Sequence, residues 1–593
     1  MLGFNPLDTN KRYIITGAVG FIGYYLSKKL LDLGCRVFGV DNITNIKNIR
    51  DNSGIFEYTI NGRRWKRIKG GEPFINFKNI LDGFNVHKDD GVPTSVEFKA
   101  AMDWCRDNGY IAYVPKGEYI LQPIVQNGVN YNCWMVPDKA VVYFERGATL
   151  KLVADPKIES KLVYMGNNIR FYGELTLIGN SEIGPRYGEM QSNMFIYKKK
   201  DIYIERLISK QSWGDNLFIG GEITSKDTLS SNIKIDYFQG IDAKRKNLVF
   251  QDCTDVYIKT AYLDNARYGL NSLDVEPDNW ENSNGLSCIN TVEYMNVRGL
   301  GIDLTANTLS KTAKNYIVNI NRLDVHVTQS SASVLLTYAI TLNMESFSVT
   351  TDVNINRLID TTYGSFISIK NLLINTDNIN KLLRMSASFA SNGLPEYPTV
   401  EFGQIDFRRG NVQYAGSLLD NSGGKLNINK LSVENHQDVV LRSNNTTGIC
   451  TIEINELVTR NCGKTGAGLI IVDTVNATPY LSMSKINNYY AYENRTDVKL
   501  LSLIQFNEPE TSVNFKLINL YNEKGTPVYY ANSTINKTQM QTLAGSPGMP
   551  QIFSVVYNPE GFVTAKKGSL AICTDGNIYI KSVDGGNTGW VIK

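Results

Sequence analysis

The chain has 593 residues, enough for several domains or for one very elongated domain. Its 61 Lys and Arg nearly balance its 58 Asp and Glu, which argues against a nucleic-acid-binding protein held by a general electrostatic field. No apolar run approaches membrane-spanning length, and the first twelve residues lack the basic start and apolar core of a signal peptide.

Cysteine and histidine usage argues against two further classes. The eight cysteines are scattered without a CxxC pair, which predicts buried free thiols rather than a disulfide framework or a zinc site. The three histidines, His87, His326 and His436, lie far apart in sequence and lack metal-ligand spacing. We therefore expect no histidine-based catalytic triad, no metal and no cofactor.

The N-terminal segment carries a glycine motif between two predicted strands. Residues 13–15 and 35–40 have strand patterns, and the sequence TGAVGFIG at 16–23 leads into a predicted helix at 24–33. Gly17, Gly20 and Gly23, with Asp41 after the second strand, match the dinucleotide-binding βαβ fingerprint. Over about residues 11–43 the chain resembles the nucleotide-sugar epimerases and dehydratases of the extended short-chain dehydrogenases.

The following sequence does not continue that family. No convincing Tyr-x-x-x-Lys pair follows, and a single βαβ unit cannot build a dinucleotide crevice. We interpret residues 1–45 as a vestigial, recombined fragment; the alternative is a small docking module, and NAD binding is not expected. Residues 46–84, with the basic run RRWKR at 63–67, are predicted to be a solvated connecting segment.

A turn and an amphipathic helix open the next region. The sequence DDGVP at 89–93 precedes a predicted helix at 95–107, which places Phe98, Ala101, Met102 and Cys105 on one face. A strand ending in VPKGEY at 114–119 follows. This arrangement resembles the entrance of pectate-lyase-like β-helix proteins.

From about residue 141 to 530, short alternating strands are separated by turns rich in Asn, Asp, Gly and Ser. The strands recur about every 20 to 25 residues, as in a stacked solenoid. A β-sandwich would not sustain this pattern without domain breaks. We therefore predict an all-β fold, a right-handed parallel β-helix over residues 85–535, in which polar turn residues can stack as ladders.

The C-terminal residues 536–593 have a different pattern. Hairpins are predicted around GSL at 568–570, TDG at 574–576 and GNTGWV at 586–591. This set resembles the C-terminal module of phage tail spikes and tail fibres, which lies at the tip of a homotrimer. The resemblance implies a virion tail protein, made in the host cytoplasm, that acts at the bacterial surface and contacts other phage tail proteins.

The candidate site lies between residues 213 and 280, in the segments WGDNLFIG (213–220), AKRKN (243–247) and SLDVEPD (272–278). Glycan hydrolysis needs two carboxyl groups, and on a β-helix they can come from neighbouring coils. Asp274 and Glu276 alternate onto one strand face, with Asp215 an expected partner. Arg245 could bind a substrate carboxylate or shift the pKa of an acid beside it.

The three segments also resemble a recurring pattern of phage and bacterial β-helix depolymerases, from which they depart at Asn216, Ala243 and Lys244. The resemblance implies a catalytic set, Asp215, Asp274, Glu276 and Arg245. Side chains suited to stacking on or binding sugars give a predicted substrate-binding set: Trp213, Lys244, Arg267, Tyr268 and Trp280. A structural alternative is that each acid caps a turn.

Three functions remain open. The first is a tail spike that binds and hydrolyses a capsular or O-antigen polysaccharide. The second is a lyase, in which Lys244, Arg245, Arg267 and Tyr268 neutralise a uronate and move protons. The third is a receptor-binding spike that does not cut. We expect the first, in a homotrimer that binds no nucleic acid and does not span a membrane.

If residues 1–45 are vestigial, their deletion should leave polysaccharide cleavage at the wild-type rate, because the predicted site lies in the β-helix. The rate is measured as loss of polymer size, with circular dichroism and native mass as folding controls. A folded deletion product of unchanged oligomeric state that no longer cleaves would contradict the interpretation.

Overall fold

The structure is a computed structural model that divides into two compact units, residues 1–187 with 201–208, and residues 188–200 with 209–593. It describes residues 12–16, 36–40, 57–60, 63–66, 77–126, 129–130, 132–265, 267, 271–277, 286–305, 313–330, 333–362, 364–376, 378–386, 388–389, 395–409, 416–444, 450–473, 482–492, 498, 500, 502–506, 513–522, 529–531, 552–555, 558–560, 565–573, 577–584 and 588–593.

Two short strand pairs precede the main fold. β1 (Arg12–Thr16) and β2 (Arg36–Val40) pair in parallel, which confirms the two strands predicted around the glycine motif. The glycines of that motif (Gly17, Gly20 and Gly23), the predicted helix and Asp41 lie outside the described residues. β3 (Glu57–Ile60) and β4 (Arg63–Lys66) form an antiparallel pair, so most of the basic run lies in a hairpin strand.

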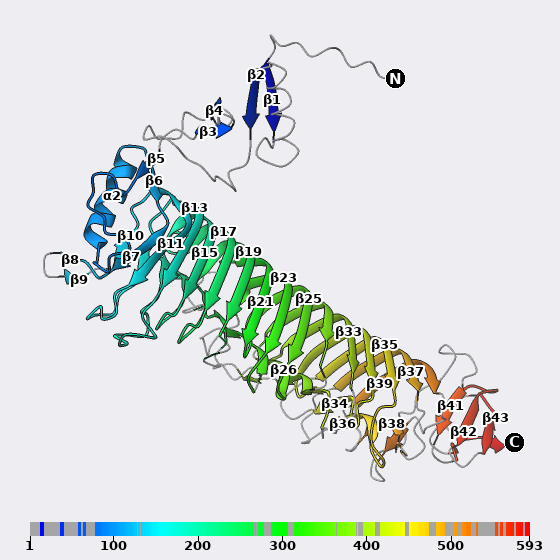
Figure 1. The fold of residues 1–593 in the computed structure, drawn as a ribbon. Coiled ribbons are helices and arrows are strands. Elements are labelled where there is room, and N and C mark those ends of the chain that lie inside the picture. Colours follow the sequence, from blue (N-terminus) through cyan, green and yellow to red (C-terminus); the bar gives the residue numbers. More distant parts are fainter. Residues whose placement is uncertain are drawn as a thin grey trace, which may run out of the picture. The chain divides into compact units, whose positions relative to one another are not determined.

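In the first unit, helix α2 (Ser95–Asp107) buries the predicted apolar face. The Phe98 ring meets the rings of Tyr119 and Trp134 edge-on, which holds the helix against the first strands (Figure 1). These strands are β5 (Phe77–Asn79), β6 (Ile111–Val114), β7 (Gly117–Leu121), β8 (Val125–Gln126), β9 (Val129–Asn130), β10 (Trp134–Met135), β11 (Val141–Leu152), β12 (Val163–Tyr164) and β13 (Arg170–Ile178). β15 (Lys200–Lys210) has its middle in this unit.

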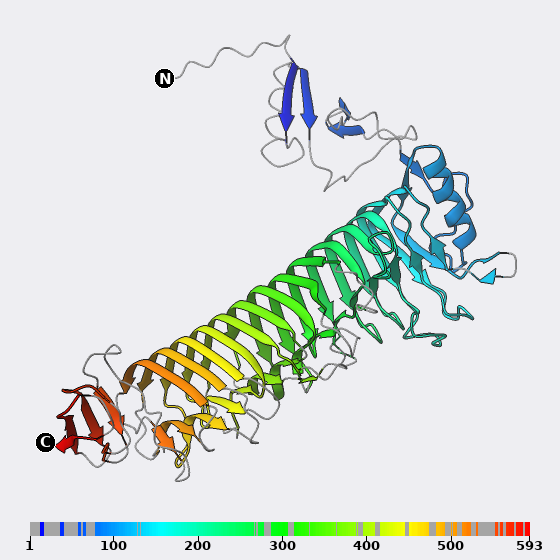
Figure 2. The ribbon, with the colours of Figure 1, turned by 180° about the vertical axis from the view of Figure 1, so that it is seen from behind.

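The second unit is a parallel β-solenoid, which confirms the predicted fold class (Figures 1 and 2). Short strands form one parallel sheet: β14 (Met194–Tyr197), β16 (Leu217–Gly220), β18 (Leu248–Gln251), β20 (Leu273–Val275), β22 (Ile302–Thr305), β24 (Ser333–Tyr338), β26 (Ile355–Thr362), β28 (Ile379–Ser386), β32 (Leu419–Asn421), β34 (Leu441–Asn444), β36 (Gly468–Asp473), β38 (Ser502–Phe506) and β40 (Tyr529–Ala531).

Longer strands form the second parallel sheet of this unit. They are β17 (Ser230–Ile241), β19 (Cys253–Asp264), β21 (Cys288–Gly299), β23 (Ala313–Val327), β25 (Ile340–Thr351), β27 (Phe366–Ile374), β31 (Thr399–Arg408), β33 (Gly424–Glu434), β35 (Cys450–Arg460), β37 (Ser482–Tyr492) and β39 (Val513–Asn522). A small antiparallel pair, β29 (Ser388–Phe389) and β30 (Pro395–Glu396), lies between β28 and β31.

The long strands whose burial is described, such as β25 and β19, consist of two alternating runs. In β25, Met344 and Phe347 point inward, and the two residues between them, Glu345 and Ser346, are both more exposed. Two consecutive outward residues shift the period-two alternation, so the strand turns a corner while both of its halves stay apolar on the inside. The same corner recurs in β19, at Lys259 and Thr260.

Inward residues of successive coils stack in rows that form the core. Ile235, Ile258 and Val292 are register neighbours, and all three are buried. The first step spans 23 residues and the second spans 34, so the predicted spacing of 20 to 25 residues is too short for some coils. Extra residues enter the turns, where insertions cost little free energy and leave the strands unchanged.

Polar ladders connect the coils in the turns, as predicted, through Asn193, Asn216 and Asn247, and a second ladder lies on the long strands. The Asn455 amide donates to Asn429 Oδ1 at 3.2 Å, and the Asn487 amide donates to Asn455 Oδ1 at 3.1 Å. Six cysteines are free and buried, as predicted: Cys105, Cys133, Cys253, Cys288, Cys450 and Cys462. Within the described ranges, no helix has the length and apolarity to span a bilayer.

The C-terminal sheet contains β41 (Ile552–Val555), β42 (Leu570–Cys573), β43 (Ile578–Lys581) and β44 (Trp590–Ile592). β43 pairs antiparallel with β42 and β44, which confirms the predicted hairpins, whereas β41 pairs in parallel with β42. The Glu560 carboxylate accepts hydrogen bonds from the N–H groups of Gly589 and Trp590 at 2.9 and 2.6 Å and thereby holds the turn before β44.

The buried His436 makes the stability of the second unit depend on pH. Burial and the nearby Arg409 lower the pKa of His436 to about 4, so the folded protein does not take up a proton that the unfolded chain accepts below the ordinary pKa of 6.5. The free energy of unfolding should therefore fall by about 2 kcal/mol from pH 7 to pH 5 through this residue.

In chemical denaturation, the free energy of unfolding of His436→Gln should fall by about 2 kcal/mol less than that of the wild type between pH 7 and pH 5, because glutamine cannot take up the proton. An identical pH dependence of wild type and variant would contradict this account.

Candidate active site

The turn that leads into each short strand of the second unit places the candidate side chains. Asp215 precedes β16, Arg245 and Lys246 precede β18, and Asp274 lies on β20. These strands stack in register through Leu217, Leu248 and Leu273, so residues about 30 positions apart in sequence become neighbours across coils.

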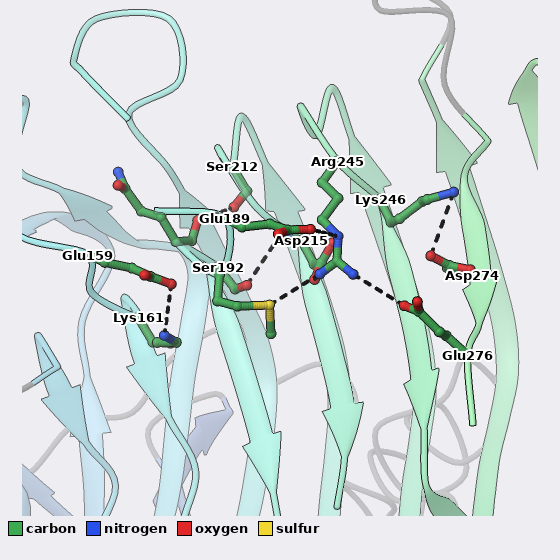
Figure 3. Close-up of polar contacts among 12 residues, drawn as sticks. Glu159, Lys161, Glu189, Ser192, Ser212, Asp215, Arg245, Lys246, Asp274 and Glu276 are labelled. Atoms are coloured by element: carbon green, nitrogen blue, oxygen red, sulfur yellow. Dashed lines mark hydrogen bonds and ion pairs between the residues drawn. The ribbon is translucent and has the colours of Figure 1, made fainter. Parts of the chain in front are cut away.

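Arg245 is the centre of the site (Figure 3). Its guanidinium Nη1 lies 3.0 Å from Asp215 Oδ2, and its Nη2 lies 3.4 Å from Glu276 Oε2. Its Nε lies 3.4 Å from Glu189 Oε1, and Nη1 also lies 3.2 Å from Met190 Sδ. One cation therefore joins carboxylates from three coils, and these include the predicted residues Asp215 and Glu276.

The backbone fixes the turn that carries Arg245. The N–H groups of Lys244 and Arg245 donate to the carbonyls of Ser212 and Gly214 at 2.9 and 3.3 Å. A Cβ atom at Gly214 would come within 2.7 Å of the Glu189 carbonyl oxygen, so only glycine permits this close approach of two coils. These main-chain contacts therefore fix the backbone from which the Arg245 side chain extends.

Asp215 lies fully buried beneath the guanidinium. Burial raises its pKa to about 7 even though Arg245 favours the ionised form, and the neighbouring Asp274 raises it as well. Its Oδ1 is buried and has no hydrogen-bond partner among the described residues. Because its side chain does not reach the surface, Asp215 is suited to positioning Arg245 rather than to touching a substrate.

Lys246 organises a second pair of carboxylates. Its Nζ lies 3.7 Å from Asp274 Oδ2 and 3.1 Å from Asp303 Oδ2. Asp274 and Asp303 are register partners on β20 and β22. Burial raises the pKa of Asp274, and the charge of Asp303 adds to this effect, whereas Lys246 opposes it. Asp274 therefore holds a proton more readily than an exposed aspartate does.

Sequence reasoning did not find Asp303 or Glu189. A signal for Asp303 exists, because the pattern Leu273-Asp274-Val275 returns one coil later as Ile302-Asp303-Leu304. Glu189 has no such signal, since it lies in an irregular segment before β14 and is brought to Arg245 only by the stacking of coils.

The structure describes three of the five predicted substrate-binding residues. Trp213 is half-buried, and the Lys244 ammonium lies 5.5 Å from its ring centre. Arg267 is exposed in a turn. Tyr268 and Trp280 lie outside the described residues.

Asn216, one of the departures from the depolymerase pattern, has an internal role. Its amide donates to the carbonyl of Ile241 at 2.9 Å and to Asn247 Oδ1 at 2.6 Å, and its Oδ1 accepts from Asn193 at 3.1 Å. It is therefore a buried ladder residue beside the site. Ala243, another departure, is also buried and packs within the turn.

This arrangement is suited to acid–base chemistry. Glu276 and Asp274 are 29% and 13% exposed, lie on the same patch, and are held in different electrostatic environments by Arg245 and Lys246. Such unlike surroundings allow one carboxyl group to stay protonated while the other is ionised. Within the described part of the chain, no cluster of three or more His, Cys, Asp or Glu could hold a metal ion.

Comparisons with known proteins give no evidence about the function of the chain. No protein-family model matches the chain. An uncharacterised 37.6 kDa protein in the cld 5′ region of Escherichia coli O111:H- is 45% identical over 38 residues, which is 6% of this chain. The chain covers only 11% of that protein's length.

Two solved structures resemble the chain over 77% of its length. The N-terminal fragment of bacteriophage phi29 gene product 12 has a TM-score of 0.43, 12% identity and 91% coverage of its own chain. The Agl-KA catalytic domain has a TM-score of 0.35, 14% identity and 70% coverage. At these values neither similarity carries an argument about function.

Arg245→Met should destabilise the second unit by about 3 kcal/mol at pH 8, because it leaves a buried carboxylate without its cation. The pKa of Asp215 is already raised to about 7, so protonation relieves this cost below neutrality, and the loss should grow as the pH rises through 7. Denaturant unfolding between pH 6 and pH 9 measures it.

The double variant Asp215→Asn/Arg245→Met is the matched control, since it removes the buried charge as well. It should recover most of the lost stability and the pH dependence should disappear. An equally unstable double variant would show that the ion pair is not the cause.

Proposed function

We propose that this protein is a phage or prophage tail spike that binds a bacterial capsular or O-antigen polysaccharide and depolymerises it by hydrolysis. The observation that carries the proposal is the cation-bridged set of carboxylates on one patch of the solenoid. Arg245 joins Asp215, Glu276 and Glu189, and Lys246 joins Asp274 and Asp303. Glycoside hydrolysis requires such a pair of accessible carboxyl groups with different protonation states.

We assign the proton-donor role to Asp274. Its pKa is raised by burial, which favours the protonated form that can donate to the leaving oxygen of a glycosidic bond. We assign the role of base or nucleophile to Glu276, because the Arg245 guanidinium at 3.4 Å stabilises its negative charge. Asp215 holds that guanidinium from below.

The tail-spike part of the proposal rests on the sequence resemblance of the C-terminal module, with support from its surface. Several large apolar side chains of this module are 40% to 55% exposed, and Ile572 and Ile578 are opposite each other on β42 and β43. Val583, Val591 and Ile592 are also exposed, and the consecutive Val591 and Ile592 point to opposite faces of β44. Exposed apolar side chains can contact other chains, and we propose that the module joins three copies of the chain.

Lyase chemistry is the second candidate, since the predicted Arg245, together with Lys246, could neutralise a uronate carboxylate. Product analysis separates the two. Hydrolysis creates new reducing ends without ultraviolet absorbance, whereas β-elimination leaves an unsaturated uronate that absorbs. A polymer that keeps its length identifies a non-catalytic receptor-binding spike.

Asp274→Asn and Glu276→Gln should each lower cleavage of the host polysaccharide at least a hundredfold, because each removes one carboxyl group from the reaction. Binding of the uncut polymer should survive, because most of the surface is unchanged. Size-exclusion chromatography measures cleavage, and surface plasmon resonance measures binding. The control is Glu456→Gln, since Glu456 is an outward acid on β35 that pairs with Lys430 at 3.0 Å, on a later coil than any residue of the site.

Wild-type cleavage rates in both active-site variants would end the assignment. Loss of cleavage together with loss of binding would instead indicate that these acids hold the glycan.

A further inference from the structure

A second surface of the solenoid has the features of a binding groove. It is a hollow of about 420 Å³ on the outer side of the long sheet, over β27, β31, β33, β35 and β37. None of the Arg245-site residues lines it. Two rows of outward side chains border it, one made of Ser368, Glu401, Asn427, Glu453 and Lys485, the other of Lys370, Gly403, Asn429, Asn455 and Asn487.

The hollow arises from a missing side chain in the second row. Gly403 takes the position where the neighbouring coils carry Lys370 and Asn429. A Cβ atom there would come within 2.3 Å of the Lys370 carbonyl oxygen, so a larger residue would require the backbone to move. The gap is therefore built into the sheet.

The lining has apolar as well as polar surface, and its charged side chains carry no net charge. Lys370 and Lys485 balance Glu401 and Glu453, and Lys370 already forms an ion pair with Glu345 at 2.6 Å. The remaining polar side chains are mainly amides, joined in the Asn429–Asn455–Asn487 ladder. Such a surface offers both donors and acceptors to a ligand that has both.

The composition favours a small polar ligand over a protein partner. Protein interfaces are enriched in aromatic residues, Met and Arg, and the only aromatic residue in this lining, Phe402, is buried in the core. The volume falls within the range of about 300 to 1,000 Å³ that is usual for ligand pockets.

Two amide oxygens of the groove, Asn427 Oδ1 and Asn487 Oδ1, are buried without a hydrogen-bond partner among the described residues. An unpaired buried acceptor is energetically unfavourable. A ligand that supplies O–H or N–H groups can relieve this cost if the amide turns toward it. A fully ionised anion such as sulfate supplies no such donor.

We propose that this groove is a second glycan-binding site, which holds an uncharged or zwitterionic segment of a polysaccharide through its hydroxyl and acetamido groups. It binds without cutting, and it does not depend on catalysis at the Arg245 site. On a tail spike, such a site would keep the polymer attached while bonds are cut elsewhere.

The test is binding of full-length protein to a glycan array of bacterial oligosaccharides, with chitotetraose as the acetamido reference and heparin tetrasaccharide as the polyanionic one. All proteins carry Glu276→Gln, so that no glycan is cut. Ser368→Trp fills the groove, and Ser432→Trp is the matched control, because Ser432 is a half-buried, outward serine on β33 that does not line it.

We expect neutral or zwitterionic glycans to bind, the heparin tetrasaccharide to bind less, and Ser368→Trp to weaken the binding at least tenfold while Ser432→Trp leaves it unchanged. Glu453→Lys should weaken it as well, without filling the groove. Equal binding by the Ser368→Trp and Ser432→Trp proteins would overturn the proposal.

Native mass measurements on the same proteins give a second check. A change of oligomeric state in Ser368→Trp alone would also overturn the proposal, because the groove would then be an interface between copies of the chain. Since the readout is binding, the result is independent of whether the wild-type protein cleaves a polysaccharide.

Discussion

Parallel backbone pairing between successive coils is the constraint on which the second unit depends. Each coil sets its strands in register with the next at a spacing of about 4.8 Å, so a side chain meets the residue one coil away rather than its sequence neighbours. Buried rows such as Ile235, Ile258 and Val292 keep that register, because a slip of one residue would turn apolar side chains outward. The same register brings Arg245 to Asp215 and Glu276.

The candidate site uses this scaffold to hold charges that would otherwise be costly. Asp215 is buried, which disfavours its charge and raises its pKa to about 7, and Arg245 at 3.0 Å offsets part of this cost. The more exposed Glu276 shares Arg245 with it, whereas Asp274 pairs with Lys246. A rigid arrangement of this kind keeps two carboxyl groups in unlike states without a large rearrangement, which acid–base catalysis requires.

Much of this architecture can be predicted from local sequence patterns, because the alternation of apolar and polar residues within a strand is visible in the sequence itself. It predicts the solenoid and the face of α2. The choice of Asp215, Glu276 and Arg245 rests on coil spacing and on the resemblance to β-helix depolymerases, and the structure brings these three side chains together. Coil length does not follow, since turns accept insertions. For the same reason Lys246 was not found, because turn residues have no periodicity and their directions depend on the neighbouring coil. Glu189 is distant in sequence and had no signal at all.

The central claim is that the cation-bridged carboxylates direct water to a glycosidic bond. Digestion of the host polysaccharide in water enriched in ¹⁸O, followed by mass spectrometry of the fragments, tests it most directly. The account predicts one ¹⁸O atom for each bond cut, at the new end of the fragment, and no unsaturated sugar. Fragments that contain no ¹⁸O from the cleavage and end in an unsaturated uronate would contradict it.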